Sequence, residues 1–240
     1  MARKRKKPIL IIALDVESRH EALELVDSLR GRITYFKIGS RLFTAEGTGI
    51  VREIHEAGAS VFLDLKFHDI PATVAGSIRA ATRLGVWMMT LHTMGGVEMM
   101  KAAVEAAVDT ANRDGRERPL LVGVTILTSL TGDDLSAFTR FDGDVSDLVV
   151  RLAGRAREAG LDGVVASVEE TSRIKREVGQ DVIVVTPGIR LAGESAGDQK
   201  RVATPRDAAR SGSDYIVVGR PVIKAPSPVA AVDAILEELD

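Results

Sequence analysis

The 240-residue chain has no cysteine, no long apolar run and no large excess of charge of either sign. Without cysteine it can form neither a disulfide framework nor a thiolate metal site. Its apolar runs have the length of single strands and are far too short to cross a bilayer. The four histidines form no HxxxH or HxH ligand pattern, so we expect no metal site.

The charge is unevenly distributed along the chain. The formal net charge is −2, of which the first seven residues, MARKRKK, contribute +5, so the remainder carries −7. Because an acidic body is a poor match for nucleic-acid phosphates, we expect no nucleic-acid partner. The short apolar runs lead us to expect no membrane partner. The alternative is a basic nucleic-acid-binding arm. It predicts salt-sensitive binding that disappears when residues 1–7 are removed.

The basic start also lacks the apolar segment of a secretory signal. We therefore expect a soluble cytoplasmic protein. Residues 1–8 are predicted to form a basic, disordered tail, and residues 9–240 a single catalytic domain.

What the chain does contain is a regular alternation of apolar, strand-length runs with segments of helical periodicity. Ser18 to Glu21 has the spacing of a capping box, and Thr204 followed by Pro205 is typical of a helix start. Four predicted helices have both bounds: Ser18 to Leu29, 97–113, 168–178 and 227–239. Two more are predicted by their ends, at Gly58 and near Gly160, and two by their starts, near Pro71 and at Thr204. The predicted strands are ILIIALD (9–15), ITYFKIG (33–39), SVFLDLK (60–66), VWMMTLH (86–92), PLLVGVTILT (119–128), GVVAS (163–167), DVIVVTPG (181–188) and DYIVVG (214–219).

Eight such units in one chain of this length predict an α/β fold, a single-domain (β/α)8 TIM barrel. Parallel strands that are buried on both faces are expected to read as continuous apolar runs, as these do. A doubly wound open sheet is the alternative. It is less favoured because the count reaches eight and no glycine-rich dinucleotide motif follows the first strand.

Polar residues stand at the ends of these predicted strands. In a barrel all of those ends meet at one face, where active sites are built. Asp64 and Lys66 are two residues apart, so on a regular strand they point to the same side. The residues at these ends are Asp15, Lys37, Asp64, Lys66, His92, Thr128, Arg190, Gly219 and Arg220. So many polar groups at one end indicate a pocket rather than isolated surface charges.

The last two strand ends indicate what this pocket binds. TPGIR and VVGRPVIKA each place glycine near arginine, at the position where barrels often bind phosphate. Arg220 would supply a charge-assisted contact to that phosphate. Between Arg190 and Gln199 the segment LAGESAGD suits a lid over a bound anion, although its composition fits an ordinary mobile loop equally well.

Taken together, these motifs resemble the bacterial type of orotidine 5′-phosphate decarboxylase. The resemblance rests on ALD, FKIG, DLKFHDIPATV, LTS, PGIR…DQKR and VVGRPV, from Ile9 to about Lys224, and its D-x-K-x-x-D-I-P-x-T core is specific. One departure is Thr93 in LHTMGG, where this family commonly has alanine.

The resemblance implies a cofactor-free conversion of orotidine 5′-monophosphate to UMP and carbon dioxide, the last step of de novo UMP synthesis. It implies a homodimer whose active sites are shared across the interface. The charged array at the reacting carbon would be Lys37, Asp64, Lys66 and Asp69, with Asp69, Ile70 and Thr73 coming from the partner subunit. The other implied contacts are Thr128 to the pyrimidine, Asp15 and Lys37 to the ribose, and Arg190, Gln199, Gly219 and Arg220 to the phosphate and its lid.

A second enzyme class stays open on the same residues. Magnesium-dependent sugar-phosphate decarboxylases or aldolases of the same barrel type, such as 3-keto-L-gulonate 6-phosphate decarboxylase, share the D-x-K-x-x-D strand end. DIPAT after the charged core and DQKR near the phosphate loop favour the nucleotide enzyme. A chelator separates the two, since the orotidylate reaction is expected to ignore EDTA.

Overall fold

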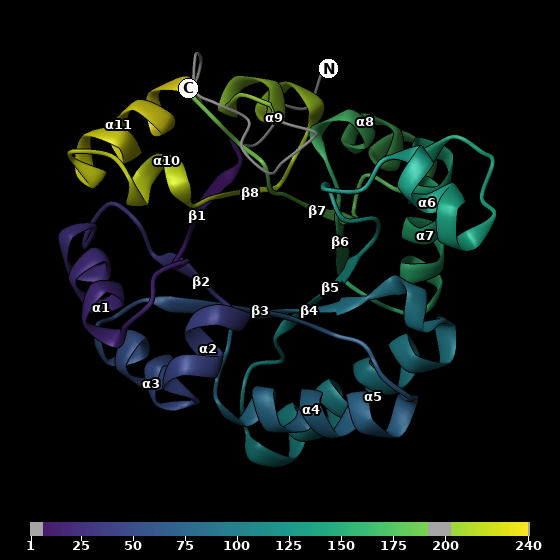
Figure 1. The fold of residues 1–240 in the computed structure, drawn as a ribbon. Coiled ribbons are helices and arrows are strands. Elements are labelled where there is room, and N and C mark those ends of the chain that lie inside the picture. The colour runs from purple at the N-terminus through teal and green to yellow at the C-terminus, as the bar shows by residue number, and fades with distance from the viewer. Residues whose placement is uncertain (1–6, 192–202, 240) are drawn as a thin grey trace, which may run out of the picture.

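The structure is a computed structural model that describes residues 7–191 and 203–239. Eight parallel strands pair in chain order, and the last pairs with the first, so the sheet is a closed barrel with the helices around it (Figure 1). The predicted (β/α)8 TIM barrel is confirmed. The strands are β1 (Ile9–Ala13), β2 (Tyr35–Gly39), β3 (Ser60–Phe67), β4 (Met88–His92), β5 (Leu120–Val124), β6 (Gly163–Val165), β7 (Ile183–Thr186) and β8 (Tyr215–Val218).

The helices follow the strands around the outside of the barrel. Several begin where the sequence predicts: Ser18 caps α1, Pro71 opens α4, and Thr204 caps α9 with Pro205 in its first turn. The helices are α1 (Arg19–Ser28), α2 (Ser40–Glu46), α3 (Gly49–Glu56), α4 (Pro71–Arg83), α5 (Val97–Asp114), α6 (Gly132–Thr139), α7 (Val145–Glu158), α8 (Val168–Glu177), α9 (Pro205–Ser211), α10 (Arg220–Ile223) and α11 (Pro228–Glu238), with a 3-10 turn η1 (Thr93–Gly95).

Most predicted strands are one to four residues too long at one end or both, and two regions differ more clearly. The helical stretch before Gly58 is two helices, because Gly47 adopts φ 65° and ends α2. β5 ends at Val124 rather than Thr128, and the loop that follows contains α6. A capping box between Thr131 and Asp134 starts α6, and that Thr-x-x-Asp spacing is visible in the sequence.

Two apolar clusters stabilise the barrel. The larger one lies between the strands and the surrounding helices. The smaller one occupies the barrel interior, and its buried members are Ile11, Ala13, Phe62, Met88, Val122, Val185 and Val217. Because side chains alternate along each strand, Leu10 and Ile12 belong to the outer cluster while Ile11 and Ala13 belong to the inner one.

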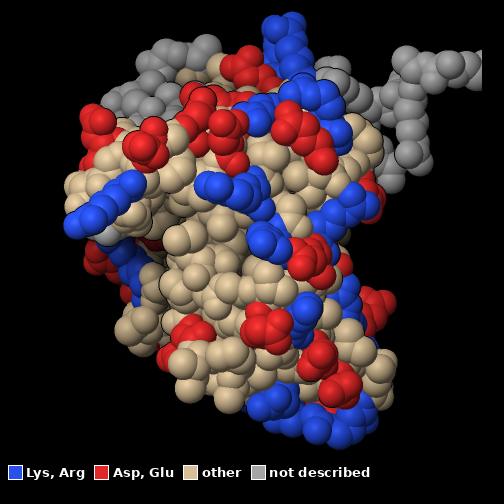
Figure 2. Space-filling model, turned by 90° about the vertical axis from the view of Figure 1, so that its right-hand side faces the viewer, with Lys and Arg blue, Asp and Glu red and all other residues tan. Residues whose placement is uncertain are grey.

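The outer surface visible in Figure 2 carries basic and acidic side chains that are interspersed, and neither sign dominates it. Exposed ion pairs such as Arg155–Glu158 and Arg157–Asp181 lie on or beside α7. In the part of the chain that the structure describes, no helix is both long and apolar enough to cross a membrane. The tail predicted over residues 1–8 falls outside the described residues except for Lys7 and Pro8.

Candidate active site

A cavity of about 610 Å³ opens at the carboxyl ends of the strands. Its floor includes members of the inner apolar cluster, such as Phe62, Val185 and Val217. The predicted residues that line it are Asp15, Lys37, Asp64, Lys66, Thr128, Arg190, Gly219 and Arg220. This volume lies in the range of small-molecule sites, which is about 300–1,000 Å³. Eight predicted site residues from separate strands and loops are thus brought together.

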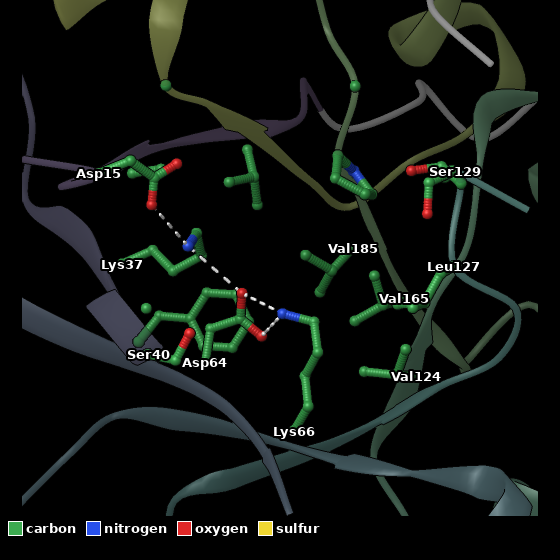
Figure 3. Close-up of a pocket in the computed structure, with 18 of the residues that line it drawn as sticks. Asp15, Lys37, Ser40, Asp64, Lys66, Val124, Leu127, Ser129, Val165 and Val185 are labelled. Atoms are coloured by element: carbon green, nitrogen blue, oxygen red, sulfur yellow. Dashed lines mark hydrogen bonds and ion pairs between the residues drawn. The ribbon is translucent and has the colours of Figure 1, made fainter. Parts of the chain in front are cut away.

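Charged side chains alternate in sign along one wall of this cavity. Asp15 Oδ1 lies 3.4 Å from Lys37 Nζ, and Lys37 Nζ lies 3.3 Å from Asp64 Oδ2. Lys66 Nζ donates to both oxygens of Asp64, at 2.8 and 2.9 Å. Figure 3 shows Lys66 extending toward Asp64, with Val124, Val165 and Val185 on its other side.

Burial and neighbouring charges set the ionisation of this wall. The side chains of Lys37 and Asp64 are 11% and 12% exposed. Burial alone would raise the pKa of Asp64, but the ammonium groups of Lys37 and Lys66, with hydrogen bonds from Lys66 and Thr90, hold it below its ordinary value. Burial would likewise lower the pKa of Lys37, but Asp64 and Asp15 raise it above its ordinary value. Asp64 is therefore ionised and Lys37 protonated near neutral pH.

Asp64 and Lys66 meet as predicted, but not through regular strand alternation. Lys66 has φ 52°, in the left-handed region that non-glycine residues rarely adopt. The pairing of β3 with β4 shifts between Leu63 and Phe67, which marks a bulge. The bulge re-aims the end of β3 so that both side chains reach the cavity.

Three predicted residues lie outside the cavity wall. Asp69, Ile70 and Thr73 are exposed on the loop after β3 and the first turn of α4. The Asp69 carboxylate accepts a hydrogen bond from the backbone N–H of Ile70, at 2.6 Å. Ile70, although apolar, is 66% exposed. Gln199, and the lid predicted over 191–198 beyond Leu191, lie outside the described residues.

His92, at the end of β4, also stays outside the cavity wall. Its ring lies 5.3 Å from that of His68. The pKa of His92 is lowered mainly by burial and further by the neighbouring His68 and Lys66. This ring is therefore neutral near pH 7. Thr93, the departure noted in the sequence, is buried and donates its hydroxyl to the carbonyl of Val124, at 2.9 Å.

Sequence reasoning missed several groups near the wall. Ser40, Arg41 and Ser129 line the cavity, as does Lys224 at the end of α10. Thr90 lies behind the wall, is 0% exposed, and bonds both Asp64 and Lys66. Its signal in the sequence is a single hydroxyl inside the apolar run VWMMTLH. Within the described ranges, no group of three or more His, Asp or Glu side chains could hold a metal ion.

Comparisons with known proteins agree with this geometry. Residues 8–235 match the model of the Orotidine 5′-phosphate decarboxylase / HUMPS family. The chain is 46% identical over 240 residues to the orotidine 5′-phosphate decarboxylase of Moorella thermoacetica, covering 100% of this chain and 95% of that one. It is 46% identical over 233 residues to the enzyme of that name from Vibrio cholerae, covering 97% of each chain.

Solved structures give the same result. The crystal structure of orotidine 5′-phosphate decarboxylase from Lactobacillus acidophilus superimposes with a TM-score of 0.85 at 34% identity, covering 98% of this chain and 100% of that one. The crystal structure of an uncharacterized conserved protein from Geobacillus kaustophilus superimposes with a TM-score of 0.84 at 35% identity, covering 96% of this chain and 100% of that one.

Proposed function

Since the chain belongs to the orotidine 5′-phosphate decarboxylase / HUMPS family, we propose that it converts orotidine 5′-monophosphate to UMP and carbon dioxide, the last step of de novo UMP synthesis. The observation that carries this proposal is the Lys37–Asp64–Lys66 array on the cavity wall, in which Lys37 and Asp64 are largely buried and Lys66 is half-buried. It places an ammonium group and a carboxylate in contact in a cavity whose lining combines charged side chains with apolar ones such as Val124, Val165 and Val185. The relatives with this name align over nearly the whole chain.

The chemistry explains why such an array is needed. When the C6–carboxyl bond breaks, the electron pair stays on C6, in the plane of the pyrimidine ring and out of conjugation with its π system. No ordinary electron sink can accept that pair, so the protein must stabilise the carbanion electrostatically. A fixed ammonium group in a water-poor cavity stabilises developing negative charge far better than water does.

Lys66 is the group to which we assign this role. Its ammonium faces the cavity and is held by both oxygens of Asp64. As carbon dioxide leaves, the ammonium stabilises the electron pair on C6 and then donates its proton to that carbon. Lys66 becomes neutral and regains a proton from solvent before the next turnover.

Asp64 acts on the ground state in this scheme. Held beside the substrate carboxylate, it repels that negative charge, and the repulsion disappears as carbon dioxide departs. Lys37 lies between Asp64 and Asp15 and keeps Asp64 ionised through its opposite charge. In the substrate complex, Asp64 and the substrate carboxylate thus repel each other until carbon dioxide leaves.

The rest of the cavity positions the nucleotide. We assign Thr128 to the pyrimidine, Asp15 and Lys37 to the ribose, and Arg190, Gly219 and Arg220 to the phosphate. Gln199 stays a proposed phosphate contact on the lid. Phosphate binding is remote from C6, but its energy can drive closure and so lower the barrier there. Arg220→Ala is therefore expected to reduce kcat/KM for the nucleotide far more than for the free nucleoside; equal losses for both would contradict the assignment.

We also propose a homodimer with shared active sites, in which Asp69, Ile70 and Thr73 reach the partner's cavity. Two observations support it: these residues are exposed beside the site, and the apolar side chain of Met94, on the next strand-end turn, is 54% exposed. The test mixes the inactive variants Asp69→Ala and Lys66→Ala. After equal mixing and free exchange, about half of the dimers are hybrids, and each hybrid has one intact site. A shared site therefore predicts about a quarter of the total wild-type activity. No recovery despite demonstrated exchange would contradict it.

The experiment that tests the function follows the ultraviolet absorbance of orotidine 5′-monophosphate mixed with the purified protein and EDTA. Rapid conversion to UMP is the expected result, since the proposed reaction uses no cofactor or metal. No conversion with EDTA, but activity on a sugar phosphate when magnesium is added, would favour the magnesium-dependent alternative. The cytoplasmic location expected from the sequence stays a prediction.

A further inference from the structure

The backbone at Lys66 is an unusual feature of this site. Lys66 and Arg140 are the two non-glycine residues with positive φ in the part of the chain that the structure describes. Such a conformation persists only where the surroundings hold it in place, and it concentrates at functional sites. Something must therefore hold Lys66 in the conformation that delivers its ammonium group to Asp64.

The pairing between β3 and β4 locates the group that does so. Leu63 pairs with Met89 and Phe67 pairs with Leu91, so three residues of β3 stand opposite the single residue Thr90. The regular ladder of backbone hydrogen bonds is interrupted there. In its place, the backbone N–H of Lys66 donates to Thr90 Oγ1, at 2.9 Å.

The same hydroxyl also fixes Asp64. Thr90 Oγ1 donates to Asp64 Oδ1 at 2.9 Å, and that oxygen is one of the two that accept from the Lys66 ammonium. A hydroxyl has one hydrogen to donate and lone pairs to accept, so both of these bonds can form together. Thr90 is fully buried, so its hydroxyl has no contact with solvent.

From this geometry we infer that Thr90 is a positioning residue, whose hydroxyl sets the relative placement of the Asp64 carboxylate and the Lys66 ammonium. The inference rests on the proposed function for its catalytic consequence. Without the hydroxyl, Asp64 can turn between its two lysines, and the backbone of Lys66 loses its acceptor. A displacement of about 1 Å in such a site can cost about 10²-fold in rate.

The test compares Thr90→Val, which keeps the shape and removes the hydroxyl, with Thr90→Ser, which keeps the hydroxyl. The matched control is Thr82→Val, since Thr82 is 1% exposed and donates its hydroxyl to the carbonyl of Ile78, at 2.8 Å on α4. We expect Thr90→Val to lower kcat by roughly 10- to 100-fold with KM within roughly threefold, because the phosphate contacts are untouched. Thr90→Ser and Thr82→Val should both stay within roughly threefold of wild-type kcat.

A second readout is independent of substrate. Hydrogen exchange of the Lys66 amide, followed by NMR, should speed up in Thr90→Val and stay slow in Thr90→Ser and Thr82→Val. If Thr90→Val does not fold, Thr90→Cys, whose thiol is only a weak donor and acceptor, replaces it.

Two results would overturn the inference: a kcat within roughly threefold of wild type in the variant without the hydroxyl, or a loss of kcat that serine does not rescue. An inactive wild type would instead refute the proposed function. Hydrogen exchange of the Lys66 amide would then be the remaining test of the inference. Unchanged exchange in Thr90→Val would overturn the claim that the Thr90 hydroxyl holds the Lys66 backbone in place.

Discussion

Both ends of the barrel hold partly or fully buried opposite charges, but these charges have different partners. At the amino ends of the strands, Asp214 lies just before β8 and accepts from Lys175 Nζ at 2.6 Å. At the carboxyl ends, Asp64 accepts from Lys66 Nζ at 2.8 Å. The pairs are alike in chemistry and distance, so their roles must be read from the groups that surround them.

At the amino end, each carboxylate also bonds the backbone of another strand. Asp214 accepts from the N–H of Val184 in β7, at 2.7 Å, and Lys175 Nζ donates to the carbonyl of Val182, at 2.7 Å. Asp162, just before β6, accepts from the N–H of Leu121 in β5, at 2.8 Å, and from Arg118. These charges join neighbouring strands, so we expect them to contribute to stability.

At the carboxyl end, the donors to Asp64 are all side chains: those of Lys37, Lys66 and Thr90. The charges there face a cavity instead of joining strands. The comparison teaches that a carboxylate bonded to the backbone of a neighbouring strand serves the fold, whereas one held only by side chains beside a cavity is available for chemistry.

Removal of the reactive ammonium should have the largest effect at the carboxyl end. Lys66→Ala is expected to lower kcat by at least about 10⁴-fold, because the carbanion loses both its electrostatic partner and its proton donor. Circular dichroism and thermal melting should match those of the wild type. Near-normal turnover by the purified variant would remove the proton-donor assignment.

The corresponding change at the amino end should act on stability. Asp214→Ala leaves the Lys175 ammonium and the Val184 N–H without the carboxylate, which should lower the free energy of unfolding by about 3 kcal/mol. Urea denaturation measures this loss. kcat of the folded variant should equal that of the wild type; a matching loss of kcat would break the distinction between the two ends.

Acid should reveal the ionised state of Asp64. Its pKa is lower in the folded protein than the ordinary value of 3.8, so the unfolded chain binds the proton more readily. The stability that this carboxylate contributes is present above pH 4 and is lost as pH falls through its folded-state pKa. Between about pH 5 and pH 2 the wild type should therefore lose more unfolding free energy than Asp64→Asn. Equal acid sensitivity of both proteins would contradict the depressed pKa.

The smallest effect is expected on the outer surface, where charges of both signs are interspersed. Arg155 and Glu158 on α7 pair at 2.7 Å, but their side chains are 60% and 53% exposed. Glu158→Gln should change the free energy of unfolding by less than about 0.5 kcal/mol, because solvent screens such pairs. Calorimetry that showed a loss near that of Asp214→Ala would mean that distance alone, rather than backbone anchoring, sets the value of an ion pair.

The sequence predicted the barrel and most of the cavity wall because both follow from local patterns. Buried parallel strands read as apolar runs, and a polar residue that ends such a run, such as Asp15, is expected at the carboxyl face. Helix starts at Ser18 and Thr204 were predictable because capping depends on a few adjacent residues.

What the sequence did not reveal depends on pairing between strands or on other chains. The bulge that turns Lys66 to φ 52° arises from how β3 meets β4, so the role of Thr90 became visible only in the structure. Strand alternation predicted the contact between Asp64 and Lys66 correctly but for an incomplete reason. The predicted role of Asp69 concerns a second subunit, which a single chain does not contain.

The most direct test makes the same substitution at both ends: the free energy of unfolding of Lys66→Met and of Lys175→Met at pH 7, by urea denaturation. Lys175→Met should lose about 2–3 kcal/mol, less than a fully buried pair because the Asp214 side chain is 39% exposed. Lys66→Met should lose less than about 1 kcal/mol or gain stability, since Asp64 keeps Lys37 and Thr90 as partners. Equal losses in the two variants would contradict the division of the barrel into a reactive end and a structural end.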